Sequence, residues 1–451
     1  MALGRTITRV TGLRMSSVAE VRLWGSTIGA VAVDGPDQIA TFEYTAAFQR
    51  SGIEVAPLTM PLAQKLHRFP DLPRQAFHGL PGMLADALPD SFGNAVTNAW
   101  LASQGRLPQD IDAVERLCYT GSRGVGALEF RPARGPQSRV STEVRVDALV
   151  RLASEVLGDR RTLHASFADP HKEHALREIL RVGASAGGAR AKAVIAWNPQ
   201  TNEVHSGQVT APEGFQYWLI KFDGVTNNKD RDLADPQGFG SIEYAYALMA
   251  KAAGIRMSEC RLFQENGRRH FMTRRFDRLP DGGKLHMQSL GAIAHFDFND
   301  AGGHSYEQAL LVIRRLGLPM DAIEEQFRRM VFNVVARNQD DHVKNIAFLM
   351  DQSGAWSLSP AFDVMYAHNP SGHWTASHQM RLAGKRDDFT PDDIKAVART
   401  AGMQRGRAKT IAREVAQAVR RWPDFADAAG VHATQRDMIA AAHRLKLVEG
   451  S

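Results

Sequence analysis

The chain of 451 residues has little of several features that would assign a protein to a class at once. Its two cysteines, Cys118 and Cys260, are too few for a disulfide scaffold or a cysteine-rich zinc module, and such scarcity is typical of the reducing cytoplasm. No apolar run approaches the ~18 residues of a membrane helix, so we expect no transmembrane segment. The net charge of +6 permits an anionic partner but requires none.

The composition is otherwise that of an ordinary globular protein, with 44% hydrophobic and 23% charged residues. At about 150 residues a domain, the length suggests about three domains. Residues 1–17 contain arginines but lack the apolar core of a secretory signal, and we interpret them as a disordered extension. Changes in pattern then predict domains at 18–142, 143–285 and 286–451.

The first predicted domain mixes strands and helices. Residues 18–33 alternate as a hairpin does, with a turn at Gly25–Thr27, and a further strand follows at Ile39–Tyr44. A helical region spans Leu88–Gln104. The run Gly121–Gly126 leads into a strand, Ala127–Phe130, and not into a helix, so we interpret it as a structural turn.

The rest of the chain changes from a mixed pattern to a mostly helical one. Domain 143–285 is expected to contain helices and strands, with Asn266-Gly267 closing a hairpin. Its expected helices are 145–157, 171–180 and 241–254, and its expected strands are 192–197, 217–222, 260–263 and 270–275. Domain 286–451 is expected to contain helices 305–316, 321–336, 391–401, 407–421 and 434–446, and a strand at 346–350. The pattern predicts an α+β protein.

Several polar residues follow one another in the order that phosphoryl transfer requires. The glycine-rich segment Gly183–Lys192 precedes a strand, where small residues would let backbone N–H groups approach phosphates; a flexible turn is the alternative. Lys221 closes an apolar strand, which is costly unless the lysine is paired or reaches solvent. Glu243, expected in the first turn of the next helix, is a candidate partner for Lys221, although acidic residues are common there.

The strongest local signal is the polar segment Asn338–Asn345. Asp340 and Asn345 have the Asp-x₄-Asn spacing of a kinase catalytic loop, between a helix and a strand. Asp363 follows 18 residues later in the apolar segment Ser359-Pro-Ala-Phe-Asp-Val, where a kinase has its metal-binding aspartate, although the glycine of Asp-Phe-Gly is absent. The alternative is a solvated hydrophilic turn. We interpret His342 as a residue that orients this loop.

At these residues the sequence resembles the HipA-like serine/threonine kinases, the toxins of bacterial toxin–antitoxin pairs. The resemblance extends from about Val18 over nearly the whole chain. The matching segments are Leu84–Ser91, Thr120–Phe130, Ser185–Lys192, Arg275–Arg278, Asn338–Asn345 and Pro360–Asp363. It implies a small N-terminal α/β domain followed by a two-lobed kinase-like core, similar also to phosphoinositide kinases, with a mostly helical C-lobe.

The resemblance also implies roles for individual residues. Asp340 would be the catalytic base, Asn345 and Asp363 would hold Mg²⁺, and Lys221, supported by Glu243, would contact the ATP phosphates. Ser185 would be phosphorylated by the protein itself, which would place charge where the nucleotide binds. The resemblance implies further nucleotide contacts from Ser185, Ala186, Gly187, Gly188, Ala189, Arg274, Arg275, Phe276, Asp277, His342 and Lys344.

By resemblance the activity is that of an ATP- and Mg²⁺-dependent protein serine/threonine kinase. The target would be a translation-related protein, typically an aminoacyl-tRNA synthetase such as glutamyl-tRNA synthetase, with growth arrest and persistence as the outcome. A HipB-like helix-turn-helix antitoxin would neutralise the toxin in the cytoplasm and carry it to operator DNA on the nucleoid. Arg274, where some members have an acidic residue, and the segment Leu285–Leu290 depart from the family pattern.

Two alternatives stay open at this point. The run Asp341-His-x-x-Asn345 also resembles inositol-lipid kinases, so the acceptor hydroxyl could belong to a lipid or a small molecule. The chain could instead be a catalytically weak corepressor subunit of an antitoxin–DNA complex. Two groups of histidines, around 164–174 and at His295 and His304, lack the companions and spacing of a metal site.

Overall fold

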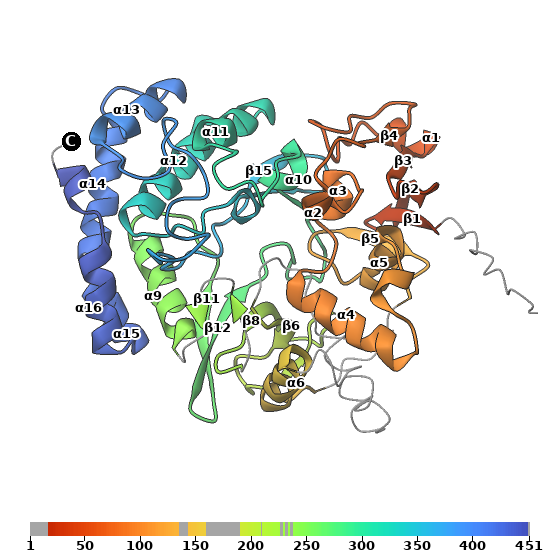
Figure 1. Ribbon diagram of the computed structural model, residues 1–451, viewed down its shortest axis with the longest axis horizontal. Coiled ribbons are helices and arrows are strands. Elements are labelled where there is room, and N and C mark those ends of the chain that lie inside the picture. Colours follow the sequence, from red (N-terminus) through yellow and green to blue (C-terminus); the bar gives the residue numbers. More distant parts are fainter. Residues whose placement is uncertain are drawn as a thin grey trace, which may run out of the picture.

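The computed structural model describes residues 17–134, 143–158, 190–208, 210–225, 229–230, 233–234 and 238–449. The predicted helix 171–180, nearly all of the predicted extension and the glycine-rich residues 183–189 lie outside these ranges. Within them, no helix combines the length and apolar character needed to span a membrane. Figure 1 shows the N-terminal sheet at one end of the molecule and a group of C-terminal helices at the other.

The N-terminal sheet is antiparallel, with the strand order β4-β3-β2-β1-β5. Its strands are β1 (Ser17–Leu23), β2 (Ser26–Val33), β3 (Ala40–Tyr44), β4 (His67–Arg68) and β5 (Leu128–Arg131). The predicted alternation is confirmed, because Val21, Val31 and Phe42 are fully buried on one face. The turn lies one residue earlier than expected, at Trp24 and Gly25, which both have positive φ. The indole Nε1 of Trp24 donates to the carbonyl of Lys284 at 2.6 Å, a long-range contact that local pattern cannot reveal.

Short helices connect this sheet to the rest of the protein. They are α1 (Ala46–Gln49), α2 (Arg74–Phe77), α3 (Gly82–Ala85), α4 (Ser91–Ser103), the 3₁₀ helix Pro108–Asp110 and α5 (Ala113–Thr120). Asp90 caps α4, since its side chain accepts from the backbone N–H of Gly93 at 2.7 Å. Helix α4 packs with α6 (Val146–Gly158) in the same apolar core as Trp218 of the central sheet. The N-terminal segment therefore helps to form the core of the next part of the chain.

The central sheet is also antiparallel, with the order β11-β12-β8-β6-β7. Its strands are β6 (Lys192–Trp197), β7 (Val204–Ser206), β8 (Gln216–Lys221), β11 (Cys260–Glu265) and β12 (Arg268–Arg274); a separate pair comprises β9 (Lys229–Asp230) and β10 (Leu233–Ala234). The predicted Asn266-Gly267 hairpin is confirmed, and both residues have positive φ. Helix α9 (Phe239–Ala252) packs on β11 and β12 and, through Tyr246 and Met249, joins the core of the C-lobe.

The C-lobe is mostly helical, as expected. Its helices are α10 (Leu290–Ala294), α11 (Tyr306–Arg315), α12 (Met320–Val335), the 3₁₀ helix Val343–Asn345, α13 (Pro391–Thr400), α14 (Arg407–Arg420), α15 (Trp422–Ala429), α16 (Ala433–Ala442) and α17 (Lys446–Glu449). A small sheet orders β13 (His286–Ser289), β14 (Ala347–Met350) and β15 (Trp356–Leu358). The predicted helix 434–446 is wrong in extent, because His443 leaves the helical region after α16. The α+β class and the two-lobed core are confirmed.

Candidate active site

The ammonium group of Lys221 joins the two lobes. Lys221 ends β8, and its Nζ lies 2.6 Å from Glu243 Oε1 on α9. The same Nζ forms an ion pair with Asp363 of the C-lobe. Glu243 lies in the second turn of α9, not in the first as expected, because the helix begins at Phe239. The structure thus brings together three of the predicted site residues around one buried charge.

Lys221 and the two carboxylates stabilise each other's charged forms. Burial alone would lower the pKa of Lys221, but the carboxylates of Asp363 and Glu243 outweigh burial and raise it. Burial alone would raise the pKa of Asp363, but Lys221 and Lys192 outweigh it and lower that pKa to about 2. Lys221 is therefore charged and Asp363 ionised across the physiological range. An ionised carboxylate is a good ligand for a hard cation.

Asp363 has an unusual backbone, with φ of 54°. Such a conformation is unfavourable for a residue with a side chain and often occurs at functional sites. The preceding segment is fixed from two directions: the N–H of Ala361 donates to the carbonyl of Arg256 at 2.7 Å, and Arg329 donates to the carbonyl of Ser359 at 2.8 Å. These contacts hold Asp363 in place opposite Lys221.

The catalytic loop predicted at Asn338–Asn345 follows α12. The side-chain amide of Asn345 donates to the backbone carbonyl of Asp340 at 2.8 Å, which closes the loop and leaves the amide oxygen available. The carboxylate of Asp340 is 46% exposed, and the nearest ring nitrogen of His342 lies 3.8 Å from it. His342 also accepts from the N–H of Lys344 at 3.3 Å, and its role of orienting the loop stays a prediction.

Two small cavities of about 30 Å³ each meet at Phe362, Asp363 and Val364. Lys221, Glu243 and Cys260 line one of them, on the side of the central sheet. The other includes Asp341, His342 and Asn345 on the side of the catalytic loop. The oxygen ligands of Asn345 and Asp363 therefore border one cavity, and this donor set fits Mg²⁺ completed by phosphate and water. Bound Mg²⁺ would neutralise charge on phosphate oxygens.

The side chains of the Arg275–Arg278 motif form a buried ion-pair cluster. Asp277 accepts from Arg275 at 2.6 Å, from Arg278 at 2.8 Å and from the N–H of Gly126 at 2.7 Å, all in a buried cluster. Burial would raise the pKa of Asp277, but the two arginines lower it strongly. This cluster fastens the Gly121–Gly126 turn to the end of β12. The nucleotide contacts expected from Arg275 and Asp277 stay predictions.

The other residues predicted to contact the nucleotide lie at several places around the site. Arg274 Nη1 lies 3.7 Å from Glu259 Oε2, where β12 ends and β11 begins. The ring of Phe276 lies 5.7 Å from that of Phe362, next to Asp363. Lys344 is in cation–π distance of Phe298, at 4.3 Å. Ser185, Ala186, Gly187, Gly188 and Ala189 lie outside the described residues, so their roles stay predictions.

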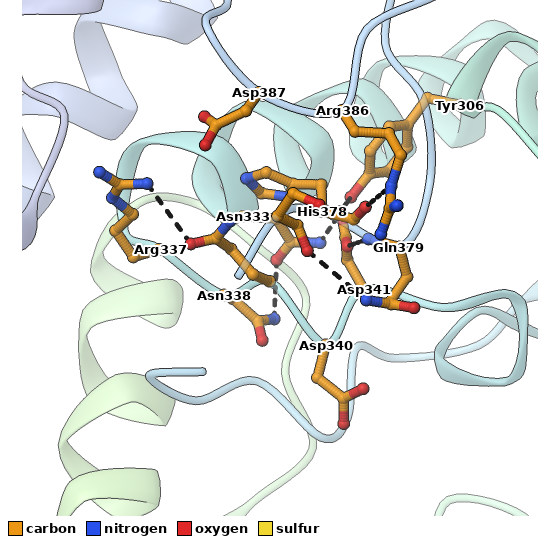
Figure 2. A network of polar contacts seen from close by, with 12 residues as sticks. Tyr306, Asn333, Arg337, Asn338, Asp340, Asp341, His378, Gln379, Arg386 and Asp387 are labelled. Carbon is orange, nitrogen blue, oxygen red and sulfur yellow. Dashed lines mark hydrogen bonds and ion pairs between the residues drawn. The ribbon is translucent and has the colours of Figure 1, made fainter. Parts of the chain in front are cut away.

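Sequence analysis did not identify two buried residues that lie next to the site residues and have partners far away in the chain. Lys192, which ends the glycine-rich motif, is 2% exposed, and its Nζ lies 3.0 Å from Asp90 Oδ2. Asp341, which follows the predicted base, is buried beneath the loop and contacts Tyr306 and His378 (Figure 2). No local signal connects these partners, since they lie 35 and 37 positions apart from Asp341.

Two family models match this chain. Residues 184–422 match the HipA-like C-terminal domain, and residues 19–131 match the HipA N-terminal domain. Two curated relatives from Sinorhizobium fredii, "Putative kinase Y4mE" and "Putative kinase Y4dM", are 26% and 25% identical over 26% and 49% of this chain. The alignments span 30% and 55% of those relatives.

A solved structure shares the fold over nearly the whole length. It is described as the Shewanella oneidensis toxin–antitoxin system HipA, HipB and operator DNA complex. The match has a TM-score of 0.66 at 16% identity and covers 95% of this chain and 96% of that one. Since the matched C-terminal domain alone spans more than half of the sequence, the chain belongs to the HipA family.

Proposed function

We propose that the protein is an ATP- and Mg²⁺-dependent serine/threonine kinase toxin of the HipA type. The observation that carries the proposal is the Lys221 ammonium between Glu243 and Asp363, across the site from the Asp340–Asn345 loop. A lysine beside phosphates, a helix glutamate that holds it and two oxygen ligands for Mg²⁺ are the parts that kinases share.

The residues of the chain would divide the work of the transfer. Lys221 would neutralise phosphate oxygens, with Glu243 fixing its position. Asp340, whose carboxylate is half exposed, would accept the proton of the attacking hydroxyl and orient it. Asn345 and Asp363 would hold the metal. The contribution of the protein is positioning and charge stabilisation without a covalent enzyme intermediate.

The burial of Asp341 supports Asp340 as the base. Asp341 directs its carboxylate into the protein, with 1% of its side chain exposed, so it has little access to an acceptor hydroxyl. A lipid-kinase interpretation that begins at Asp341 would need that carboxylate in the site. As the resemblance implies, the proposed substrate is a translation-related protein such as an aminoacyl-tRNA synthetase, together with Ser185 of the chain itself.

A partner of the HipB type is part of the proposal. The structure that shares this fold was solved as a complex of HipA, HipB and operator DNA. By analogy, a small helix-turn-helix antitoxin would neutralise this protein and carry it to operator DNA. Copurification of the chain with the product of an adjacent gene would test the partnership.

Phosphoproteomics after brief induction would test the kinase activity and its target. Wild-type protein should produce a small set of new phosphoserine or phosphothreonine sites that the Asp363→Asn variant does not produce. Mass spectrometry of the purified wild type should find phosphate on Ser185. Sites that appear equally with both proteins would not be its products, and growth inhibition that persists in Asp340→Asn would favour the corepressor alternative.

A further inference from the structure

The carboxylate of Asp341 is the centre of a buried polar network beneath the catalytic loop (Figure 2). It accepts three hydrogen bonds: from the hydroxyl of Tyr306 at 2.6 Å, from Nδ1 of His378 at 2.7 Å and from the backbone N–H of Gln379 at 2.7 Å. Tyr306 and His378 are buried as completely as Asp341. A carboxylate with three donors is held in a single orientation.

The chemistry of the donors fixes the proton positions. Burial and the negative charge of Asp341 raise the pKa of Tyr306 far above its usual value, so its hydroxyl stays protonated and donates. An ionised carboxylate accepts only, so His378 must carry a proton on Nδ1. The Nε2 atom of His378 is buried and has no hydrogen-bond partner among the residues that the structure describes. The hydrogen bond from Nδ1 to Asp341 therefore holds the His378 ring, and rotation of the ring would break it.

The three donors come from two parts of the C-lobe, α11 and the segment 374–386. Tyr306 begins α11, and its hydroxyl also accepts from Asn333 of α12 at 3.0 Å. His378 and Gln379 belong to the segment 374–386, in which the backbone of His378 pairs with Arg386. Asn338, at the start of the catalytic loop, is tied to Asn333 at 2.9 Å. Both sides of the predicted base are thus attached to the rigid helices.

Asp340 and Asp341 point in opposite directions, and Figure 2 shows Asp340 apart from the network. The Asp340 side chain is 46% exposed, whereas that of Asp341 is 1% exposed. Since the two residues share a peptide bond, fixing Asp341 fixes the backbone from which the predicted base projects. A displacement of about 1 Å can reduce a rate by about 100-fold, so this support bears directly on transfer.

We propose that Asp341 and His378 are a positioning pair for phosphoryl transfer, which holds Asp340 at the acceptor hydroxyl and ties that position to the segment 374–386. The inference rests on the proposed kinase function and deepens it. Neither residue needs to touch the nucleotide. Their loss should therefore lower the transfer rate at saturating ATP and leave nucleotide affinity nearly unchanged.

The test compares variants that keep or remove one hydrogen bond. We expect Asp341→Asn to lower the single-turnover rate of phosphate transfer from radiolabelled Mg·ATP about 10- to 100-fold, with the Kd for a fluorescent ATP analogue changed less than about 3-fold. His378→Leu should behave similarly. His378→Asn retains an amide donor near the Nδ1 position and should recover much of the rate.

A matched pair of tyrosine variants separates positioning from stability. Tyr306 and Tyr246 are both fully buried in the C-lobe core, and Tyr246 donates to the carbonyl of Ala336 at 2.7 Å. Tyr306→Phe should slow transfer, whereas Tyr246→Phe should alter stability alone, at equal folded fraction by circular dichroism. If all of the network variants transfer phosphate as fast as Tyr246→Phe, the positioning role is overturned. A wild type that transfers no phosphate overturns the proposed function itself, and this inference with it.

Discussion

Lys192 and Lys221 lie directly opposite each other on the adjacent strands β6 and β8, and both are almost fully buried. Like charges in this arrangement repel, so each requires its own counter-charge. Asp90 supplies it for Lys192, and Glu243 and Asp363 supply it for Lys221. The N-terminal segment therefore takes part in the charge balance of the site, because Asp90 precedes helix α4.

Removal of Asp90 should destabilise the protein strongly. The variant Asp90→Ala leaves the Lys192 ammonium buried beside Lys221 and also removes the cap of α4. We expect the free energy of unfolding to fall by about 3–5 kcal/mol, the usual cost of breaking a buried ion pair. Urea unfolding followed by circular dichroism would measure the change.

Asp112 offers a matched control for that variant. It caps α5 in the same way, by accepting from the N–H of Glu115 at 2.8 Å, and the residue is partly exposed. Asp112→Ala should therefore cost about 1 kcal/mol, the usual value for a lost cap. Equal losses from the two variants would mean that the pairing with Lys192 contributes little.

Glu243 should govern nucleotide binding through Lys221. In Glu243→Gln the lysine keeps a hydrogen-bond acceptor but loses the charge that fixes it, and we expect the Kd for ATP to rise about 10-fold. Lys221→Met should weaken binding further. Isothermal titration with Mg·ATP would measure both, with Lys251→Met, an exposed lysine of the same helix, as the control. Unchanged affinity in both site variants would argue against Lys221 as a phosphate ligand.

Buried neutral histidines should make the protein sensitive to acid. Burial lowers the pKa of His270 and of His286 to about 4, and both side chains are fully buried. The unfolded chain binds these protons near pH 6.5, before the folded chain does, so stability is full above that pH and falls as pH decreases toward 4. Each histidine should contribute a loss on the order of 3 kcal/mol.

The acid effect can be assigned with one variant. Nδ1 of His270 accepts from the N–H of Asp223 at 2.9 Å, and His270→Asn keeps an acceptor there without a titrating ring. Its stability should depend less steeply on pH between 6.5 and 4 than that of the wild type. Identical slopes in urea unfolding at several pH values would show that His270 does not cause the loss. Asp363, whose pKa is lowered from 3.8 to about 2, affects stability only at lower pH, as the pH falls from about 3.8 toward 2.

Local patterns in the sequence predicted much of the fold. Alternating residues indicated the first hairpin of the N-terminal sheet, and Asn266-Gly267 fixed the hairpin between β11 and β12 of the central sheet. The ends of helices that depend on tertiary contacts were harder to predict from the sequence. Helix α15 was not expected, because the run 407–421 gave no sign that Trp422 would begin a separate helix buried in the core.

The site residues also fall into those that local sequence indicated and those that it did not. Kinase-like spacing indicated Asp340, Asn345 and Asp363. The energetic cost of burying a charged lysine at the end of an apolar strand indicated Lys221. The spacing could not show where Asp277 points, since its partner Gly126 lies 151 positions away. For the same reason it could not reveal that Asp90 forms an ion pair with Lys192 or that His378 contacts Asp341. Such pairings depend on the folded arrangement and leave no periodic signal.

The most direct test of the account is phosphate transfer by the purified protein with one carboxylate changed. Wild type, Asp340→Asn and Asp392→Asn should be incubated with γ-labelled Mg·ATP; Asp392 lies on α13 with 87% of its side chain exposed and serves as the control. We predict that Asp340→Asn binds ATP normally but transfers phosphate about 10² to 10⁴ times more slowly, while Asp392→Asn equals the wild type. Undiminished transfer by Asp340→Asn would contradict the account.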